Sequence, residues 1–183
     1  AAMVYGDEVI AGMGVAMRVF SISFFLLFGF STGFQPLAGY SYGAKNYKRL
    51  NESIKTSLIW ATGISLFFFL VFLVGKEPIL RLFSDVDEIV MYGVMIINAM
   101  LIFMPFIGFQ IITTTLFQAL GKGKEALVLS IARQGIFLIP AIIILPKIFE
   151  LKGVIYSQPL ADGFTLIVSL ILFIRIIKEL KTI

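Results

Sequence analysis

Two charged side chains lie within long apolar stretches of the sequence, and they are the residues best placed for polar chemistry. Arg18 follows Val9 by nine residues, Asp162 follows Gly153 by nine residues, and neither stretch carries another charge. At about 1.5 Å per helical residue, each lies on the order of 14 Å from the start of its stretch. A lone charge in hydrocarbon costs roughly 3 kcal/mol or more, and aspartate is too short to reach the interface. We therefore predict that Arg18 and Asp162 form a contact or share a polar cavity. The alternative is that Arg18 extends outward and Asp162 faces a water-filled recess.

A further arginine and several uncharged polar residues occupy the other apolar stretches and could line a polar pathway. Arg133 is close enough to one border to extend to the interface, whereas Gln134 is too short. The remaining polar groups between residues 98 and 118 are Asn98, Gln110, Thr113, Thr114, Thr115 and Gln118. Hydrogen bonds between helices, typically under about 1 kcal/mol each, are the alternative role for these groups. The candidates for a substrate or ion pathway are Arg18, Asn98, Gln110, Thr114, Gln134 and Asp162.

The residue types that are missing exclude several kinds of chemistry. The chain has no cysteine and no histidine, which removes disulfides, thiolate nucleophiles and the commonest metal ligand. The apolar stretches contain no paired carboxylates. We therefore expect no catalytic residues, no metal and no cofactor. The net charge of +4 comes from short basic clusters, so we expect no nucleic-acid partner.

Five long apolar segments must position the polar residues. Hydrophobic residues make up 59% of the chain, charged residues make up 14%, and the mean hydropathy is +1.00, values outside the range of soluble domains. The segments run over residues 9–43, 56–75, 89–121, 126–146 and 153–174. About 20 residues of helix match a hydrocarbon core of about 30 Å, and none of the segments alternates in polarity as a β-barrel strand would. We predict an all-α integral membrane protein with five transmembrane helices.

Prolines fall within or near these segments and predict bends in the helices. They are Pro36, Pro105, Pro140 and Pro159. A proline removes one backbone hydrogen bond and its ring clashes with a carbonyl in the preceding turn. We expect a bundle of bent helices.

The distribution of Lys and Arg predicts the orientation in the bilayer. If the chain starts outside, the inner connections and the C-terminal tail hold nine basic residues and the outer connections hold four. Since basic residues concentrate on the cytoplasmic side, we expect a multi-pass protein of the bacterial plasma membrane with a cytoplasmic C-terminus. The odd number of segments and the absence of an initiator Met lead us to expect a piece of a longer polypeptide.

A specific motif extends from Gly33 to Lys45. It reads GFQPLAGYSYGAK and resembles the G-x-Q-P-x-x-G-Y-x-x-G-A-x pattern of the multidrug and toxic compound extrusion (MATE) transporters. Residues 118–124 and 153–162 are similar to later parts of the C-terminal lobe of that family in order and spacing. The whole chain resembles the bacterial MepA-like branch of the family.

The resemblance implies an architecture of twelve helices in two lobes around a central cavity. Residues 1–183 would form part of the C-terminal lobe, with the five segments as helices eight to twelve. The partners would be the lipid bilayer and the absent N-terminal lobe and helix seven of the same polypeptide. Such repeats are suited to alternating access around a site near the membrane midplane.

The resemblance also implies secondary active export of amphipathic, often cationic drugs by antiport with Na⁺ or H⁺. The coupling acids of the family lie in helix one and, in some branches, in helices seven and ten. Helices one and seven would lie outside this chain, and the segment that corresponds to helix ten, residues 89–121, contains no Asp or Glu. The coupling ion and its acid therefore remain unassigned. Two alternatives are a lipid-linked oligosaccharide flippase of the wider superfamily and an inert or assembly-only membrane fragment.

Overall fold

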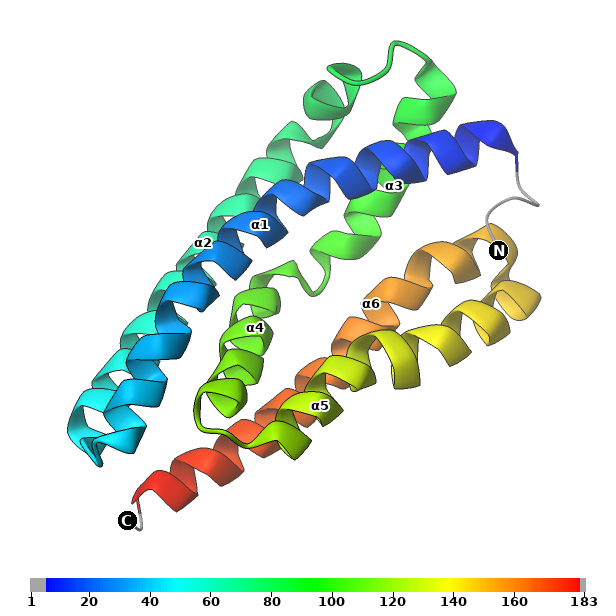
Figure 1. The fold of residues 1–183 in the computed structure, drawn as a ribbon. Helices are drawn as coiled ribbons and strands as arrows, with labels where there is room; N and C mark the ends of the chain where they lie inside the picture. Colours follow the sequence, from blue (N-terminus) through cyan, green and yellow to red (C-terminus); the bar gives the residue numbers. More distant parts are fainter. Residues whose placement is uncertain (1–5, 182–183) are drawn as a thin grey trace.

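A computed structural model describes residues 6–181 of the chain, and these residues form helices joined by short turns, with no strand among them. In chain order the helices are α1 (Asp7–Gly43), α2 (Tyr47–Arg81), α3 (Asp87–Leu101), α4 (Met104–Ala119), α5 (Gly123–Ile131), the π-helix η2 (Ala132–Phe137) and α6 (Leu138–Lys181). Figure 1 shows α1 to α4 on one side and the arms formed by α5, η2 and α6 on the other. The predicted all-α fold is confirmed.

Helices α1 and α2 are joined by a tight turn. Lys45 adopts a φ of 56°, a conformation uncommon outside glycine, and the Asn46 side chain accepts a hydrogen bond from the Arg49 N–H at 3.1 Å. The Asn46 side chain therefore caps α2 directly after the turn. At its other end α2 continues through Pro78 to Arg81.

The third predicted segment is two helices rather than one. Helices α3 and α4 are bent by 56° at the break between Leu101 and Met104. Pro105 lies in the first turn of α4, where its missing N–H costs no helical hydrogen bond. Phe103 at the break lies against Gly163 of α6, where a side chain on Gly163 would come within 2.7 Å of the Phe103 ring. The break therefore brings the α3–α4 pair into contact with the last arm.

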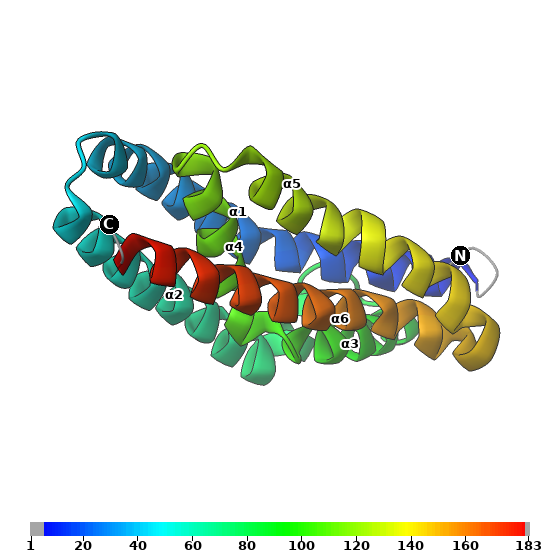
Figure 2. The same cartoon turned by 90° about the horizontal axis from the view of Figure 1, so that it is seen from below.

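Helix α6 contains a reversal of the chain. Glu150 has φ 49° and ψ −130°, so the helix divides there into two arms. Figures 1 and 2 both show the returning arm beside the arm formed by α5, η2 and the start of α6. Gly153 permits the close return, because a Cβ at Gly153 would lie 2.2 Å from the Leu145 carbonyl oxygen. The predicted segments 126–146 and 153–174 lie on the two sides of this reversal.

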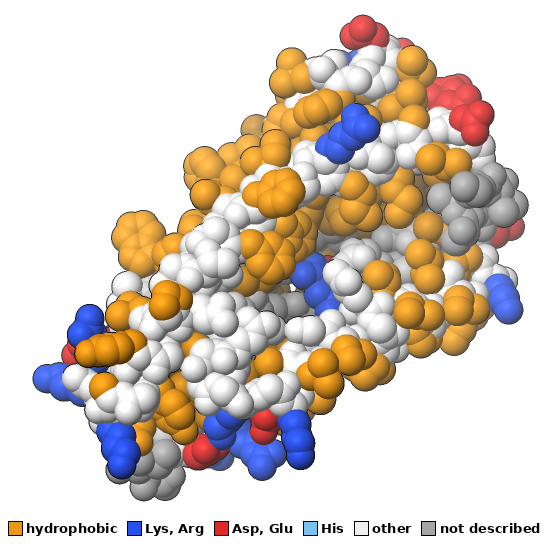
Figure 3. Space-filling model, in the orientation of Figure 1, with side chains coloured by type: hydrophobic (Ala, Val, Ile, Leu, Met, Phe, Trp, Pro, Cys, Tyr) orange, Lys and Arg blue, Asp and Glu red, His pale blue; other side chains and the backbone are white. Residues whose placement is uncertain are grey.

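The surface has the character of a protein in lipid. Three helical stretches are long and apolar enough to cross a membrane, the α3–α4 pair would be a fourth, and the longest stretch, Gly123–Leu180, includes the reversal at Glu150. Large apolar side chains are exposed along the helices, among them Phe25 (74%) and Trp60 (63%). In Figure 3 hydrophobic side chains are distributed over the visible face, and most charged side chains gather towards its ends.

Candidate functional site

An ion pair between η2 and α6 lies at the centre of the site. Arg133 Nε donates to Asp162 Oδ1 at 2.8 Å. The Asp162 side chain is 6% exposed and the Arg133 side chain is 18% exposed. A carboxylate this deeply buried needs a cationic or hydrogen-bonding partner, because the desolvation of an unpaired charge is costly. Arg133 is that partner.

The predicted contact between Arg18 and Asp162 is therefore wrong. Arg18 is exposed on α1, while its neighbours Val19 and Phe20 are buried. The two charges were placed at equal distances from the starts of their segments, but that distance does not determine the direction in which a side chain leaves its helix. The expectation that Arg133 extends to the interface is also wrong, because Arg133 turns inward to Asp162.

Two glutamines support Asp162 from different helices. Gln110 Nε2, on α4, donates to the backbone carbonyl of Asp162 at 3.1 Å. Gln158 Nε2, one turn earlier on α6, lies 3.5 Å from Asp162 Oδ1, at the upper limit for a hydrogen bond. The hydrogen bond from Gln110 links the α3–α4 pair to the last arm at the level of the ion pair.

Helix α1 contacts the ion pair through an aromatic ring. The Arg133 guanidinium carbon lies 5.0 Å from the centroid of the Phe24 ring, within the range of a cation–π contact. The Phe24 ring is also 5.9 Å from that of Phe20 and 6.3 Å from that of Phe28, measured between centroids. Arg133 therefore lies between a carboxylate on α6 and a row of rings on α1.

The π-helix η2 positions Arg133 and Gln134. Pro140 follows η2, and a proline both lacks an N–H and presses on the carbonyl four residues earlier, here that of Ile136. One wide turn upstream accommodates the proline without ending the helix, and single π-turns are frequent at functional sites. The sequence predicted a bend at Pro140 but not that it takes the form of a π-turn.

Two cavities adjoin the ion pair. The first, of about 310 Å³, is lined mainly by residues of polar type, and we call it the polar cavity. The second, of about 360 Å³, we call the aromatic cavity. The polar cavity is lined by Phe28, Ser31, Thr32, Gln35, Gln110, Ile111, Thr114, Thr115, Gln118, Leu129, Ser130, Arg133, Gln134 and Thr165. The aromatic cavity is lined by Met17, Phe20, Ser21, Phe24, Phe25, Phe28, Met100, Arg133, Gln134 and Gln158.

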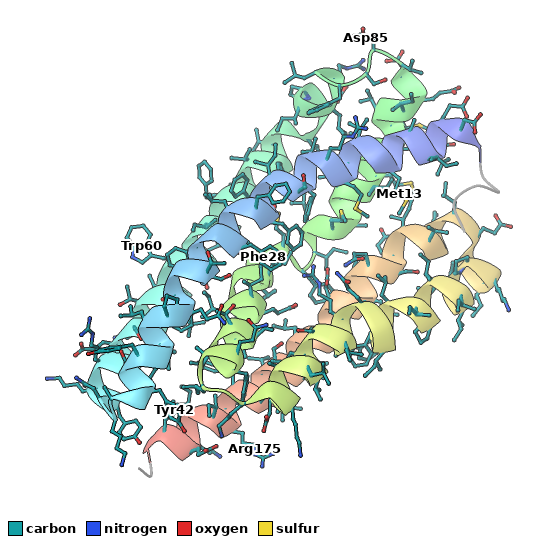
Figure 4. The ribbon with its side chains drawn as sticks, in the orientation of Figure 1. Met13, Phe28, Tyr42, Trp60, Asp85 and Arg175 are labelled. Carbon is teal, nitrogen blue, oxygen red and sulfur yellow. The ribbon has the colours of Figure 1, made fainter. Side chains whose placement is uncertain are left out.

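Three residues, Phe28, Arg133 and Gln134, line both cavities, so the cavities meet at η2. Figure 3 shows a hollow in this face with basic side-chain atoms in it, and Figure 4 places Phe28 on the side of α1 that faces the hollow. Both volumes lie at the lower end of the range of small-molecule sites, roughly 300–1,000 Å³. The site can hold an apolar ring on one side and hydrogen-bonding groups on the other.

The structure brings together some of the predicted pathway residues and not others. Gln110, Thr114 and Gln134 line the polar cavity. Asn98 lines neither cavity; it is exposed and accepts a hydrogen bond from Lys76. Arg18 also lines neither cavity.

Sequence reasoning missed the aromatic side of the site. Phe20, Phe24 and Phe28 recur at intervals of four residues, the spacing that aligns side chains on one helix face, and this was the available signal. The number of phenylalanines in the chain concealed the pattern. Gln35, which lines the polar cavity, belongs to the motif that resembled the MATE family.

Comparison with known families identifies the chain. The sequence model of the MatE family matches residues 1–144. The chain belongs to the MatE family. The resemblance carried by the segment from Gly33 to Lys45 is confirmed, whereas the assignment of the segments to helices eight to twelve stays a prediction.

Curated relatives of this MatE chain are bacterial export proteins. The multidrug export protein MepA of Staphylococcus haemolyticus (strain JCSC1435) is 31% identical over 158 residues, which are 86% of this chain and 34% of the relative. MepA of Staphylococcus aureus (strain MSSA476) is 27% identical over 170 residues, 92% of this chain and 37% of the relative. The chain spans about a third of the length of these relatives.

Solved structures show the same helical arrangement. The structure of the MATE multidrug transporter DinF-BH in complex with R6G matches with a TM-score of 0.83 and 37% identity, over 89% of this chain and 36% of that transporter. An outward-facing MATE family transporter of the MOP superfamily matches with a TM-score of 0.87 over 98% of this chain and 41% of that transporter. Its identity is 20%, so it supports the fold alone. The MatE chain thus has the fold of part of a membrane transporter.

Proposed function

We propose that this MatE chain forms one wall of the drug-binding site of a multidrug exporter. Membership of the family and the similarity to MepA proteins support export as the activity. The observation that carries the proposal is the Arg133–Asp162 pair at the junction of a polar and an aromatic cavity. Rings fit the row formed by Phe20, Phe24 and Phe28, and polar groups of a ligand fit the amides and hydroxyls of the polar cavity. This combination suits amphipathic molecules of varied shape.

We propose further that export is secondary active, by antiport with Na⁺ or H⁺ and alternating access. The break between α3 and α4 and the π-helix η2 are two points at which helices can bend as access changes. An exchanged ion must favour a conformation that the drug does not, which requires a dedicated acid. Asp162 already has Arg133 as its partner, so we expect the coupling acid to lie in the remaining part of the transporter, together with the opposite wall of the site.

The test uses the polypeptide that contains this chain, which we call the parent polypeptide, in vesicles loaded with ethidium. We expect efflux when an inward Na⁺ or H⁺ gradient is imposed and none without a gradient. An absence of gradient-dependent efflux would overturn drug export. Deletion of the gene tests the flippase alternative, which predicts cell-envelope defects without increased drug sensitivity.

Asp162→Asn tests whether the ion pair belongs to the transport site. We expect this variant to reduce the ethidium efflux rate severalfold because the amide loses the charge of the carboxylate. The amount of folded protein should change little, because the amide keeps the size of the carboxylate and the unpaired Arg133 side chain has cavity space on both sides. Asp85→Asn is the matched control, since Asp85 is exposed in the α2–α3 connection, far from the site in Figure 4. Equal losses of transport and of folded protein would assign Asp162 a structural role only.

A further inference from the structure

Arg133 separates the buried carboxylate of Asp162 from both cavities. Asp162 lines neither cavity, whereas Arg133 lines both. Residues near Asp162 line each of the two cavities: Gln158 lines the aromatic cavity, and Gln110 and Thr165 line the polar cavity. If the Arg133 side chain moved away, Asp162 would face the space in which we propose that drugs bind.

The two partners of Arg133 are those that an organic cation would choose. A carboxylate contributes charge attraction and an aromatic face contributes a cation–π contact, and Arg133 uses Asp162 Oδ1 for the first and the Phe24 ring for the second. Phe20, Phe28 and Met17 extend the apolar wall beyond this point. The side chain of Arg133 therefore occupies a site with the chemistry of a lipophilic-cation receptor.

Three features allow the arginine to leave. Arg133 donates to Asp162 through Nε, in a single hydrogen bond. Arginine–carboxylate pairs are strongest when two guanidinium nitrogens donate in parallel to the two carboxylate oxygens. The Arg133 side chain is more exposed than its partner, 18% against 6%, and has cavity space on both sides. Its backbone belongs to a π-turn, whose wide geometry is a local distortion of an otherwise α-helical arm.

We propose that Arg133 is an internal competitor for the cation site formed by Asp162 and Phe24. A lipophilic organic cation displaces the guanidinium, takes its place between carboxylate and ring, and leaves the arginine in the polar cavity. In the absence of such a ligand Arg133 neutralises Asp162 and prevents an unpaired charge. This proposal rests on the proposed export function and adds an exchangeable residue to it.

The experiment measures binding to the purified parent polypeptide, without any ion gradient. The probes are tetraphenylphosphonium, a lipophilic cation, and triphenylphosphine oxide, an uncharged analogue in which an oxygen atom replaces one of the four phenyl rings. The variants are Arg133→Gln, Asp162→Asn and the combination of both. Arg175→Gln and Asp85→Asn are matched controls, since both residues are exposed and lie towards opposite ends of the molecule in Figure 4.

Competition predicts effects of opposite sign for the two partners. We expect Arg133→Gln to increase tetraphenylphosphonium affinity by about tenfold, because the ligand no longer has to displace a charge from the carboxylate and the ring. We expect Asp162→Asn to decrease the affinity by about the same factor. The combined variant should bind as weakly as Asp162→Asn. Affinity for triphenylphosphine oxide should change by less than about twofold in each case, because an uncharged ligand gains little from the carboxylate.

A purely structural pair gives a different pattern. It predicts that both single variants lose affinity for both probes and that the combined variant, with no buried charge left unpaired, recovers. That pattern would overturn the proposal. If Arg133→Gln fails to fold, Arg133→Lys replaces it; the compact ammonium holds the carboxylate and ring less well, so we still expect a higher tetraphenylphosphonium affinity. Failure of both Arg133 variants to fold while Asp162→Asn folds would also overturn the proposal.

A failure of the Arg133 competition can be distinguished from a failure of the proposed export function. Gradient-driven ethidium efflux by the wild type, together with weaker cation binding in Arg133→Gln, would leave export intact and refute the competition. If neither the wild type nor Arg133→Gln binds the cation and no efflux occurs, both proposals fail.

Discussion

The contact between α2 and α4 and the contact between η2 and α6 join helices in opposite ways. At the first, the backbone N–H of Gly108 donates to Ser65 Oγ at 2.9 Å, and a Cβ at Gly108 would lie only 2.3 Å from the Ala61 carbonyl oxygen. At the second, the long Arg133 side chain reaches the Asp162 carboxylate between two cavities. Small residues bring backbones together and leave no room for movement, whereas a long charged side chain can exchange its partner. We infer that the first contact is the rigid part of the molecule and the second the adaptable part.

Gly108→Ala should have the largest effect, because the added methyl group meets backbone that cannot move aside. We expect a loss of about 3 kcal/mol or more of stability, at the upper end for overpacking. Thermal unfolding of the parent polypeptide in detergent measures it. Gly29→Ala is the control, since nothing lies within 4 Å of its Cβ position in α1. Similar unfolding temperatures for the two variants would show that the α2–α4 contact is not rigid.

Gly163→Ala sharpens the comparison because its obstacle is a side chain. Its Cβ would lie 2.7 Å from Phe103 Cζ, the far end of a ring that can shift. We expect a loss of about 1 kcal/mol, at the low end for overpacking, and recovery when the change is combined with Phe103→Leu. The same thermal unfolding assay measures both variants. Absence of recovery would mean that the backbone of α6, and not the ring, limits the space.

Phe24→Leu tests the adaptable contact without removing a charge. The leucine retains apolar bulk but loses the cation–π contact, worth about 1 kcal/mol, and in the wild type Arg133 loses the same contact as the ligand. In the Arg133→Gln background, where the competitor is absent, we therefore expect tetraphenylphosphonium affinity to fall by about fivefold with little change in unfolding temperature. Phe149→Leu is the control, since Phe149 is exposed near the reversal at Glu150 and lines neither cavity. Equal affinities in the two variants would exclude Phe24 from the binding site.

Lys122→Gln should have the smallest effect. Lys122 pairs with Glu179 at 2.6 Å between the α4–α5 turn and the end of α6, and both side chains are accessible to solvent. Because water and salt screen such a pair, we expect a loss of less than about 1 kcal/mol, declining further at high ionic strength. Thermal unfolding at low and high salt measures it. A large loss independent of salt would place this pair among the rigid contacts.

The sequence alone determined the class of the protein and several of the polar residues that line its cavities. Apolar segments of 20 or more residues require helices in lipid, because every backbone polar group must be satisfied within its own segment. This constraint is local, so it can be read without knowing how the helices pack. The positions of Gln110, Thr114 and Gln134 within those segments likewise identified polar side chains that line one cavity.

Only the tertiary structure decided which charges meet. A residue's position along a helix predicts its depth in the membrane. The direction of its side chain depends on how each helix is rotated about its axis relative to its neighbours, and many small packing contacts together set that rotation. Arg18 and Asp162 therefore appeared to be partners, whereas the π-turn of η2 directs Arg133 to Asp162 instead. The reversal at Glu150 and the break at Phe103 place α4, η2 and α6 around the same point. The site exists because separate segments converge there, and no single segment encodes that convergence.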